Sequence, residues 1–78
     1  MPLAARIDSA ASLGRVLEQA RLLKGLTQRD VARMIETDQK YVWQLENGKS
    51  TVAIERLLQA ADLLGVTLTA TVEENDQP

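Results

Sequence analysis

The sequence predicts an all-α domain of four short helices followed by one C-terminal β-strand. Four segments repeat apolar residues at the 3.6-residue period of an amphipathic helix, and each begins near a Ser, Thr or Asp. After Gly65 the period changes to two, which is typical of a strand. The chain has one Trp, one Tyr and no Phe. We therefore expect a small aliphatic core of Leu, Ala, Val and Ile side chains.

Each expected helix begins at a side chain that can accept a hydrogen bond from the backbone of the first turn. The candidate caps are Ser9 or Ser12, Thr27, Asp38, and Ser50 or Thr51. The helices that follow them should end near Lys24, Ile35, Glu46 and Leu64. Three of these ends are followed by a glycine, which can adopt the left-handed conformation that stops a helix.

The predicted strand covers residues 66–73, where apolar and polar residues alternate. Its apolar positions are Val66, Leu68, Ala70 and Val72. Residues 3–7 are a second and less regular strand candidate, so the C-terminal strand lacks an obvious partner within the chain. An unpaired strand exposes backbone polar groups on both edges. We therefore expect it to pair with the same strand of a second copy, as an intersubunit ribbon that buries the four apolar residues in a dimer interface.

The length of 78 residues allows one domain. We expect residues 1–11 to form an N-terminal arm, residues 12–65 the helical domain, residues 66–73 the dimerising strand and residues 74–78 an acidic tail. The net charge is −2, but residues 12–49 carry +2 whereas residues 50–78 carry −4. This uneven distribution indicates two surfaces of opposite character and does not by itself identify a DNA site.

The composition excludes several classes of function. The chain has no Cys and no His, which removes disulfides, thiolate metal sites and the commonest general base. Its four glycines fit helix ends or close packing, so they do not form a phosphate-binding loop. We predict that the protein is not an enzyme and has no cofactor or metal. The sequence has no apolar run that could cross a bilayer and no signal-peptide pattern, so we expect a cytoplasmic protein without a membrane partner.

The main functional signal is the pair of short helices expected over residues 27–35 and 38–47. The link between them is short enough to form only a tight corner, and the small Ala32 falls where two helix backbones must approach. Val42 and Leu45 give the second helix of the pair one buried side. This is the arrangement of a helix-turn-helix, whose second helix enters the major groove of DNA.

Two segments carry a resemblance to a known family. They are Leu26-Thr27-Gln28-Arg29-Asp30-Val31-Ala32 and Leu45-Glu46-Asn47-Gly48-Lys49. With the closing helix over residues 54–64, they resemble the XRE-type helix-turn-helix family of Cro and phage repressors, over residues 13–66. The resemblance implies a lambda-repressor-like helical fold that binds double-stranded DNA. The usual fifth helix of that family is replaced here by the strand, and in this respect the chain is most similar to HipB-like antitoxins.

The third expected helix turns an apolar side inward and a polar side outward, at about 100° per residue. The base-contacting candidates are Gln39, Lys40, Trp43 and Gln44. Gln can bond adenine and Lys can bond guanine, and the resemblance implies this role for Gln39, Lys40 and Gln44. Trp43 is less usual in the family. It contacts a thymine methyl or the sugar-phosphate backbone, or alternatively it folds over the second helix.

Phosphate contacts are expected from helix N-termini and loop groups. The candidates are Gln28, Tyr41, Asn47 and Lys49. The resemblance implies that Gln28, the first residue of the second helix, clamps a phosphate. Asn47 has an alternative role as a plain helix cap, and the two roles can coexist. The resemblance also implies a structural ion pair between Arg21 and Glu46 that joins the first helix to the third.

These observations predict a sequence-specific DNA-binding repressor that acts as a homodimer on a palindromic operator. The similarity to HipB-like antitoxins implies a HipBA-like toxin–antitoxin system, in which the chain would bind a HipA-like kinase toxin. Two alternatives stay open. One is a stand-alone XRE-type regulator, such as a phage repressor or a restriction-modification controller. The other is a protein-interaction module that has lost DNA binding.

Overall fold

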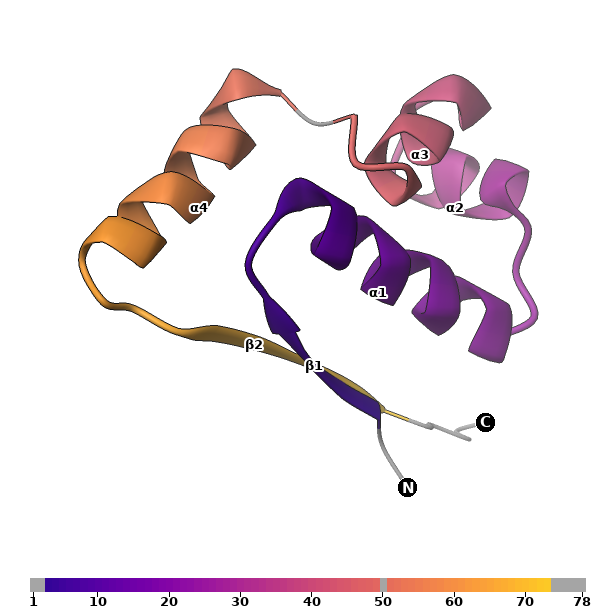
Figure 1. Ribbon diagram of the computed structural model, residues 1–78. Helices are drawn as coiled ribbons and strands as arrows, with labels where there is room; N and C mark the ends of the chain where they lie inside the picture. Colours follow the sequence, from indigo (N-terminus) through magenta and orange to yellow (C-terminus); the bar gives the residue numbers. More distant parts are fainter. Residues whose placement is uncertain (1–2, 50, 74–78) are drawn as a thin grey trace.

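The computed structural model describes residues 3–49 and 51–73. Its elements follow in the order β1 (Leu3–Ile7), α1 (Ala10–Leu23), α2 (Gln28–Met34), α3 (Gln39–Glu46), α4 (Val52–Leu63) and β2 (Leu68–Val72). Helix α1 lies between the pair α2–α3 on one side and the two strands on the other (Figure 1). The expected fold class of four helices with a C-terminal strand is confirmed.

The helices begin where their caps place them. Helix α1 starts after Ser9, whose hydroxyl accepts a hydrogen bond from the N–H of Ser12 in a capping box. Thr27 forms a second capping box at α2, and the side chains of Asp38 and Thr51 cap α3 and α4 by accepting a hydrogen bond from the backbone N–H three residues later. The alternative cap of α4, Ser50, lies outside the described residues, as does the predicted acidic tail 74–78. Every helix ends within one residue of its predicted end.

The two strands form an antiparallel sheet within the chain, in register from Leu3 opposite Val72 to Ile7 opposite Leu68. The idea that the C-terminal strand lacks a partner in its own chain is therefore wrong. Residues 3–7, expected within an arm, supply that partner. Side chains alternate between the two faces of each strand, and paired residues lie on the same face. Ala5 and Ile7 of β1 therefore share one face of the sheet with Leu68 and Ala70 of β2.

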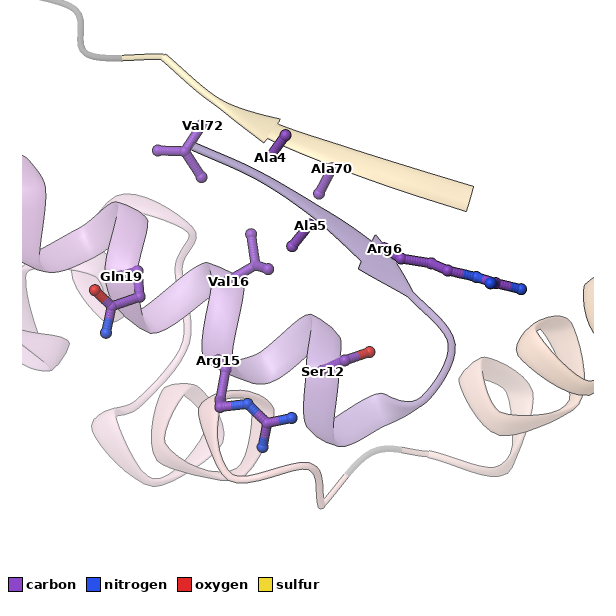
Figure 2. Close-up of a pocket in the computed structure, with 9 residues that line it drawn as sticks. All are labelled: Ala4, Ala5, Arg6, Ser12, Arg15, Val16, Gln19, Ala70 and Val72. Atoms are coloured by element: carbon purple, nitrogen blue, oxygen red, sulfur yellow. The ribbon is translucent and has the colours of Figure 1, made fainter. Parts of the chain in front are cut away.

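This apolar face of the sheet packs on α1. Val72 is only 8% exposed, and Leu68 and Ala70 are half-buried. Figure 2 shows Val16 of α1 pointing toward Ala5 of β1. A cavity of about 370 Å³ remains between the sheet and α1, next to the small side chains of Ala5 and Ala70. Val72 is thus a core residue of the single chain, and its burial needs no second copy.

Helices α1 and α3 approach each other closely at Gly14 of α1. A Cβ atom built there would lie 2.5 Å from the carbonyl oxygen of Leu45 and 2.6 Å from that of Glu46. Only glycine lets the backbone of α1 come so near the end of α3. Ala32 and Val42, which are 3% and 2% exposed, complete the core between the helices. The position of α3 on α1 therefore depends on the absence of a side chain at Gly14.

Helix α4 packs less closely than the other helices. It touches the N-terminal end of α1 through Leu58, which is 9% exposed. In Figure 1 it stands apart from α2 and α3. Several of its other apolar side chains are exposed, among them Leu57 and Leu63. A large apolar surface of α4 is therefore left uncovered by the described chain.

Candidate nucleic-acid interface

The corner between α2 and α3 is closed by short hydrogen bonds. After α2, Glu36 adopts a left-handed conformation with φ of 62°. The N–H of Thr37 then donates to the carbonyl of Ala32 at 2.8 Å. Asp38 starts α3 at once, since its carboxylate accepts a hydrogen bond from the N–H of Tyr41 at 2.9 Å. The corner thus holds α3 in one position against α2, as a helix-turn-helix requires.

Helix α3 has a buried side and an exposed side. Val42 and Glu46 lie on the buried side, at 2% and 7% exposure. Of the residues predicted to contact bases, three are exposed and Gln44 is half-buried; the exposed ones are Gln39, Lys40 and Trp43. Trp43 keeps 47% of its surface exposed, so its side chain is partly covered and partly open to solvent.

A buried ion pair fastens α3 to α1. The Nε of Arg21 lies 2.6 Å from Oε2 of Glu46, and its Nη2 donates to Oε1 at 3.0 Å. The two side chains are only 12% and 4% exposed. The remaining nitrogen of the guanidinium, Nη1, donates to the backbone carbonyl of Leu26 at 2.9 Å. Arg21 therefore holds both the end of α3 and the loop before α2, and the sequence did not indicate this second contact.

Gln28 joins the same network, a role that sequence reasoning missed. Its Nε2 donates to Oε1 of Glu46 at 3.0 Å, and its Oε1 accepts a hydrogen bond from Nε2 of Gln39 at 3.3 Å. The hydrogen bonds thus form one chain. Arg21 of α1 binds Glu46 at the end of α3, Glu46 binds Gln28 at the start of α2, and Gln28 binds Gln39 at the start of α3. An amide nitrogen carries two hydrogens. Gln28 and Gln39 therefore each keep one N–H for a ligand.

The charges of the ion pair support each other. Burial of the Glu46 carboxyl would raise its pKa, but hydrogen bonds from Arg21 and Gln28 and the charge of Arg21 outweigh burial and lower that pKa. The hydrogen bond to Glu46 raises the pKa of Arg21 in turn. Both groups are therefore charged at neutral pH, and the network keeps its geometry there.

The phosphate candidates lie at the ends of α2 and α3 and on the α3 surface. Tyr41 is 40% exposed, and Asn47 and Lys49 are exposed after the helix. The Nδ2 of Asn47 donates to the carbonyl of Trp43 at 2.9 Å, so Asn47 caps the end of α3. The half-buried Gln28 begins α2. The structure thus gathers polar donors around the exposed side of α3.

No group of three or more acidic side chains gathers into a possible metal site within residues 3–49 and 51–73. The described helices also lack the length and apolarity needed to cross a membrane.

The sequence profile of the helix-turn-helix family HTH_3 matches residues 17–70. This range contains α2, α3, α4 and the second half of α1, which is well over half of the chain. Comparisons with curated proteins and with solved structures find no match. Together with the α2–α3 corner and the buried side of α3, the profile match shows that the chain belongs to the XRE-type helix-turn-helix family of DNA-binding regulators.

Proposed function

We propose that the protein is a transcriptional repressor that binds a palindromic operator as a homodimer, with one α3 in the major groove of each half-site. One observation carries the proposal. Gln39, Lys40 and Trp43 are exposed on a helix whose buried side is fixed by the Arg21–Glu46 ion pair. Direct readout of base edges requires polar side chains presented in this way by a rigid helix.

Each outward side chain suits a different contact. Lys40 can donate to O6 and N7 of guanine, and Gln39 and Gln44 can bond adenine through one N–H and one carbonyl oxygen. The hydrogen bond that Gln39 donates to Gln28 leaves free the two groups that adenine recognition uses. Trp43 can pack on a thymine methyl or on a sugar.

The phosphate contacts position α3 without reading sequence. Gln28 can donate its remaining N–H to a phosphate, and its bond to Glu46 holds the amide in place at the N-terminus of α2. Tyr41, Asn47 and Lys49 can add a hydroxyl, an amide and an ammonium group. The phosphate role of these four residues is the part of the proposal that should be independent of the operator sequence.

A homodimer would present two α3 helices to DNA about one helical turn, roughly 34 Å, apart. The exposed apolar surface of α4 and of Val66, which is 51% exposed, supports a second copy. An intersubunit ribbon would use the edge of β2 that β1 does not occupy. Of the strand residues assigned to the interface, Val66 offers the most surface to a partner, and Leu68 and Ala70 offer less because they are half-buried.

We further propose that this repressor acts in the cytoplasm as the antitoxin of a HipBA-like system, with a HipA-like kinase toxin as its partner. The support is the strand β2, which stands where the resembled family usually has a fifth helix. Co-purification with a kinase-like protein encoded beside this chain is the expected result. A chain that binds its operator but no such kinase would instead be a stand-alone XRE-type regulator.

The assignment of α3 to the major groove is tested with DNA that the native protein selects from a random pool. Lys40→Ala and Gln44→Ala should each weaken binding to the selected sequence by about 1–3 kcal/mol, because each removes a base contact. Fluorescence anisotropy at one fixed salt concentration measures the affinity, and circular dichroism checks that the helices remain.

Arg56→Ala is the matched control, since Arg56 is exposed on α4 and its loss also removes one positive charge. Its affinity should stay close to that of the native protein. Unchanged affinity of both α3 variants would refute the groove assignment. If the native protein selected no DNA at all, the alternative of a protein-interaction module would be favoured.

A further inference from the structure

Helix α4 presents an apolar stripe that the single chain does not cover. The stripe consists of four residues spaced by four, three and four positions, which places them on one side of the helix. They are Ala53, Leu57, Ala60 and Leu64, the last being the C-cap of α4, and all are exposed. Leu57 and Leu64 keep 63% and 74% of their surface exposed. An adjacent side of α4 is already used, because Leu58, about 100° around the helix from Leu57, packs at the N-terminal end of α1.

A complementary apolar groove opens between α1, α2 and α3. Its volume is about 310 Å³, and its apolar lining residues are Leu17, Ala20, Leu26, Val31, Ile35, Val42 and Leu45. Two of these, Leu17 and Ile35, are 40% and 52% exposed. Of the α3 residues that line the groove, Val42 lies opposite Lys40 and Leu45 lies opposite Trp43, each about 200° around the helix. A segment seated in the groove would therefore leave the proposed DNA-binding side free.

The chain's own α4 is poorly placed to fill this groove. Before α4, Gly48 lies against Ala11, where an added Cβ would be 3.0 Å from the Cα of Ala11. After α4, Leu68 pairs with Ile7, just ahead of α1. Both ends of α4 are thus held near the N-terminal end of α1. The groove lies along the middle and C-terminal half of α1, from residue 17 to residue 24.

The exposed area also matches what a dimer needs. The chain has 5807 Å² of accessible surface, whereas a compact monomer of 8.6 kDa has about 4,700 Å². Its radius of gyration is 13.3 Å, against about 11.5 Å for a compact chain of this length. The excess, roughly 1,100 Å² summed over all 78 residues, is large enough to include the area of about 800 Å² that each partner contributes to a standard interface.

We infer that the α4 stripe of one copy docks into the α1–α2–α3 groove of a second copy, and that the second copy does the same in return. The inference rests on the proposed homodimer and places its contact on α4, in addition to or instead of the β2 edge. It is isologous, since each copy supplies the same stripe and the same groove. No element has to move, because the outer side of α4 and the groove are both open in the described chain.

A cross-linking experiment tests the contact directly, because the chain has no cysteine of its own. Full-length Ile35→Cys and Leu57→Cys proteins are co-expressed, purified and treated with a short bis-maleimide linker. Both positions are exposed in the single chain, so neither change should disturb folding. A covalent dimer should form in the mixture and should be absent, or at least fivefold weaker, with either variant alone.

Glu55→Cys replaces Leu57→Cys in the matched control, since Glu55 is exposed on the opposite side of α4. It should give little cross-linking to Ile35→Cys. Strong cross-linking of Leu57→Cys to itself would show that two α4 helices pack on each other and would overturn the groove. Equal cross-linking of the Glu55 and Leu57 variants, or none in either mixture, would overturn it as well.

Self-association gives an independent readout. Leu57→Asp should weaken the dimer by roughly a hundredfold in sedimentation equilibrium, because a leucine is lost from each of two symmetric contacts. Gln59→Asp adds the same charge on the other side of α4 and should leave the dimer intact. A monomeric native chain that still binds a half-site through Lys40 would overturn the docking but not the DNA-binding proposal. A dimer with the expected cross-link but no DNA binding would support the docking and overturn the DNA-binding proposal.

Discussion

At the scale of single residues, Glu46 connects three helices. Its carboxylate accepts hydrogen bonds from Arg21 of α1 and Gln28 of α2, and Gln28 in turn accepts one from Gln39 at the start of α3. A carboxylate this buried is stable only when such partners replace its water. The proposed reading side chains of α3 are therefore positioned by a charge at the C-terminal end of the same helix.

Glu46→Gln should destabilise the protein by roughly 3 kcal/mol at pH 7, because it leaves the Arg21 guanidinium buried without its counter-charge. The pKa of Glu46 is lowered in the folded state. Its stabilising contribution is therefore complete above the ordinary glutamate pKa of about 4.3, and it is lost as the pH falls through the lowered folded-state value. Thermal unfolding at pH 7 and pH 3 measures both effects, and the difference between native and variant protein should shrink at pH 3.

Glu55→Gln serves as the control, because Glu55 is exposed on α4 and its neutralisation should change stability by less than about 0.5 kcal/mol. A variant Glu46→Gln as stable as the native protein at pH 7 would mean that the ion pair does not brace α3.

The sequence predicts which residues belong to the site around Glu46, but it does not predict every hydrogen bond among them. Arg21 and Glu46 form the pair that the family resemblance implies. The bond between Gln28 and Gln39 depends on rotamers of two flexible amides, which no spacing rule fixes. The left-handed conformation of Glu36 could not be predicted either. Glutamate has no preference for positive φ, and only the tight α2–α3 corner imposes this conformation.

At the scale of elements, the helices were the most predictable part. Caps such as Ser9 and Thr27 act locally, so the sequence near each helix end suffices to place it. Strand β1 was less predictable, because its sequence has two alanines and an arginine among five residues and little strand preference. It is a strand because β2 lies beside it. Pairing between the two ends of the chain is a tertiary effect that local pattern does not carry.

Gly14→Ala should destabilise the protein by about 1–3 kcal/mol, since the new Cβ would overlap the carbonyl oxygens of Leu45 and Glu46 and push α3 from α1. The better helix propensity of alanine, worth up to about 1 kcal/mol, opposes this only in part. Chemical denaturation measures the difference. Gln19→Ala, an exposed change on the same helix, should stay within about 0.5 kcal/mol of the native protein. An alanine variant at position 14 that is more stable than native would show that the two helices have room to separate.

At the scale of the whole molecule, α1 is the central layer. It contacts the sheet on one side and α3 on the other, and α4 meets only its N-terminal end (Figure 1). This layering was not predictable from the sequence, because the apolar face of β2 reads equally well as a dimer surface or as a cover for α1. Burial of Val72 shows that it covers α1. The small core that results explains why so much apolar surface is left on α4.

Truncation after residue 65 should lower the free energy of unfolding by about 2–4 kcal/mol, because it removes the buried Val72 and leaves Ile7 and β1 without a partner. Truncation after residue 73 keeps all of β2 and should leave stability unchanged. Thermal unfolding of the two shortened chains beside the native one gives the comparison. If the shorter chain unfolded at the native temperature, the sheet would contribute nothing to the fold.

The pairing of Leu3 with Val72 brings the outer ends of β1 and β2 together on the side of α1 away from α3 (Figure 1). Fluorescent labels attached to the next pair in this register, the exposed Ala4 and Thr71, would therefore lie close enough for energy transfer without disturbing the core or obstructing a bound duplex. Loss of energy transfer during an unfolding titration would then report the separation of β1 from β2. This signal would be independent of any signal from DNA binding at α3.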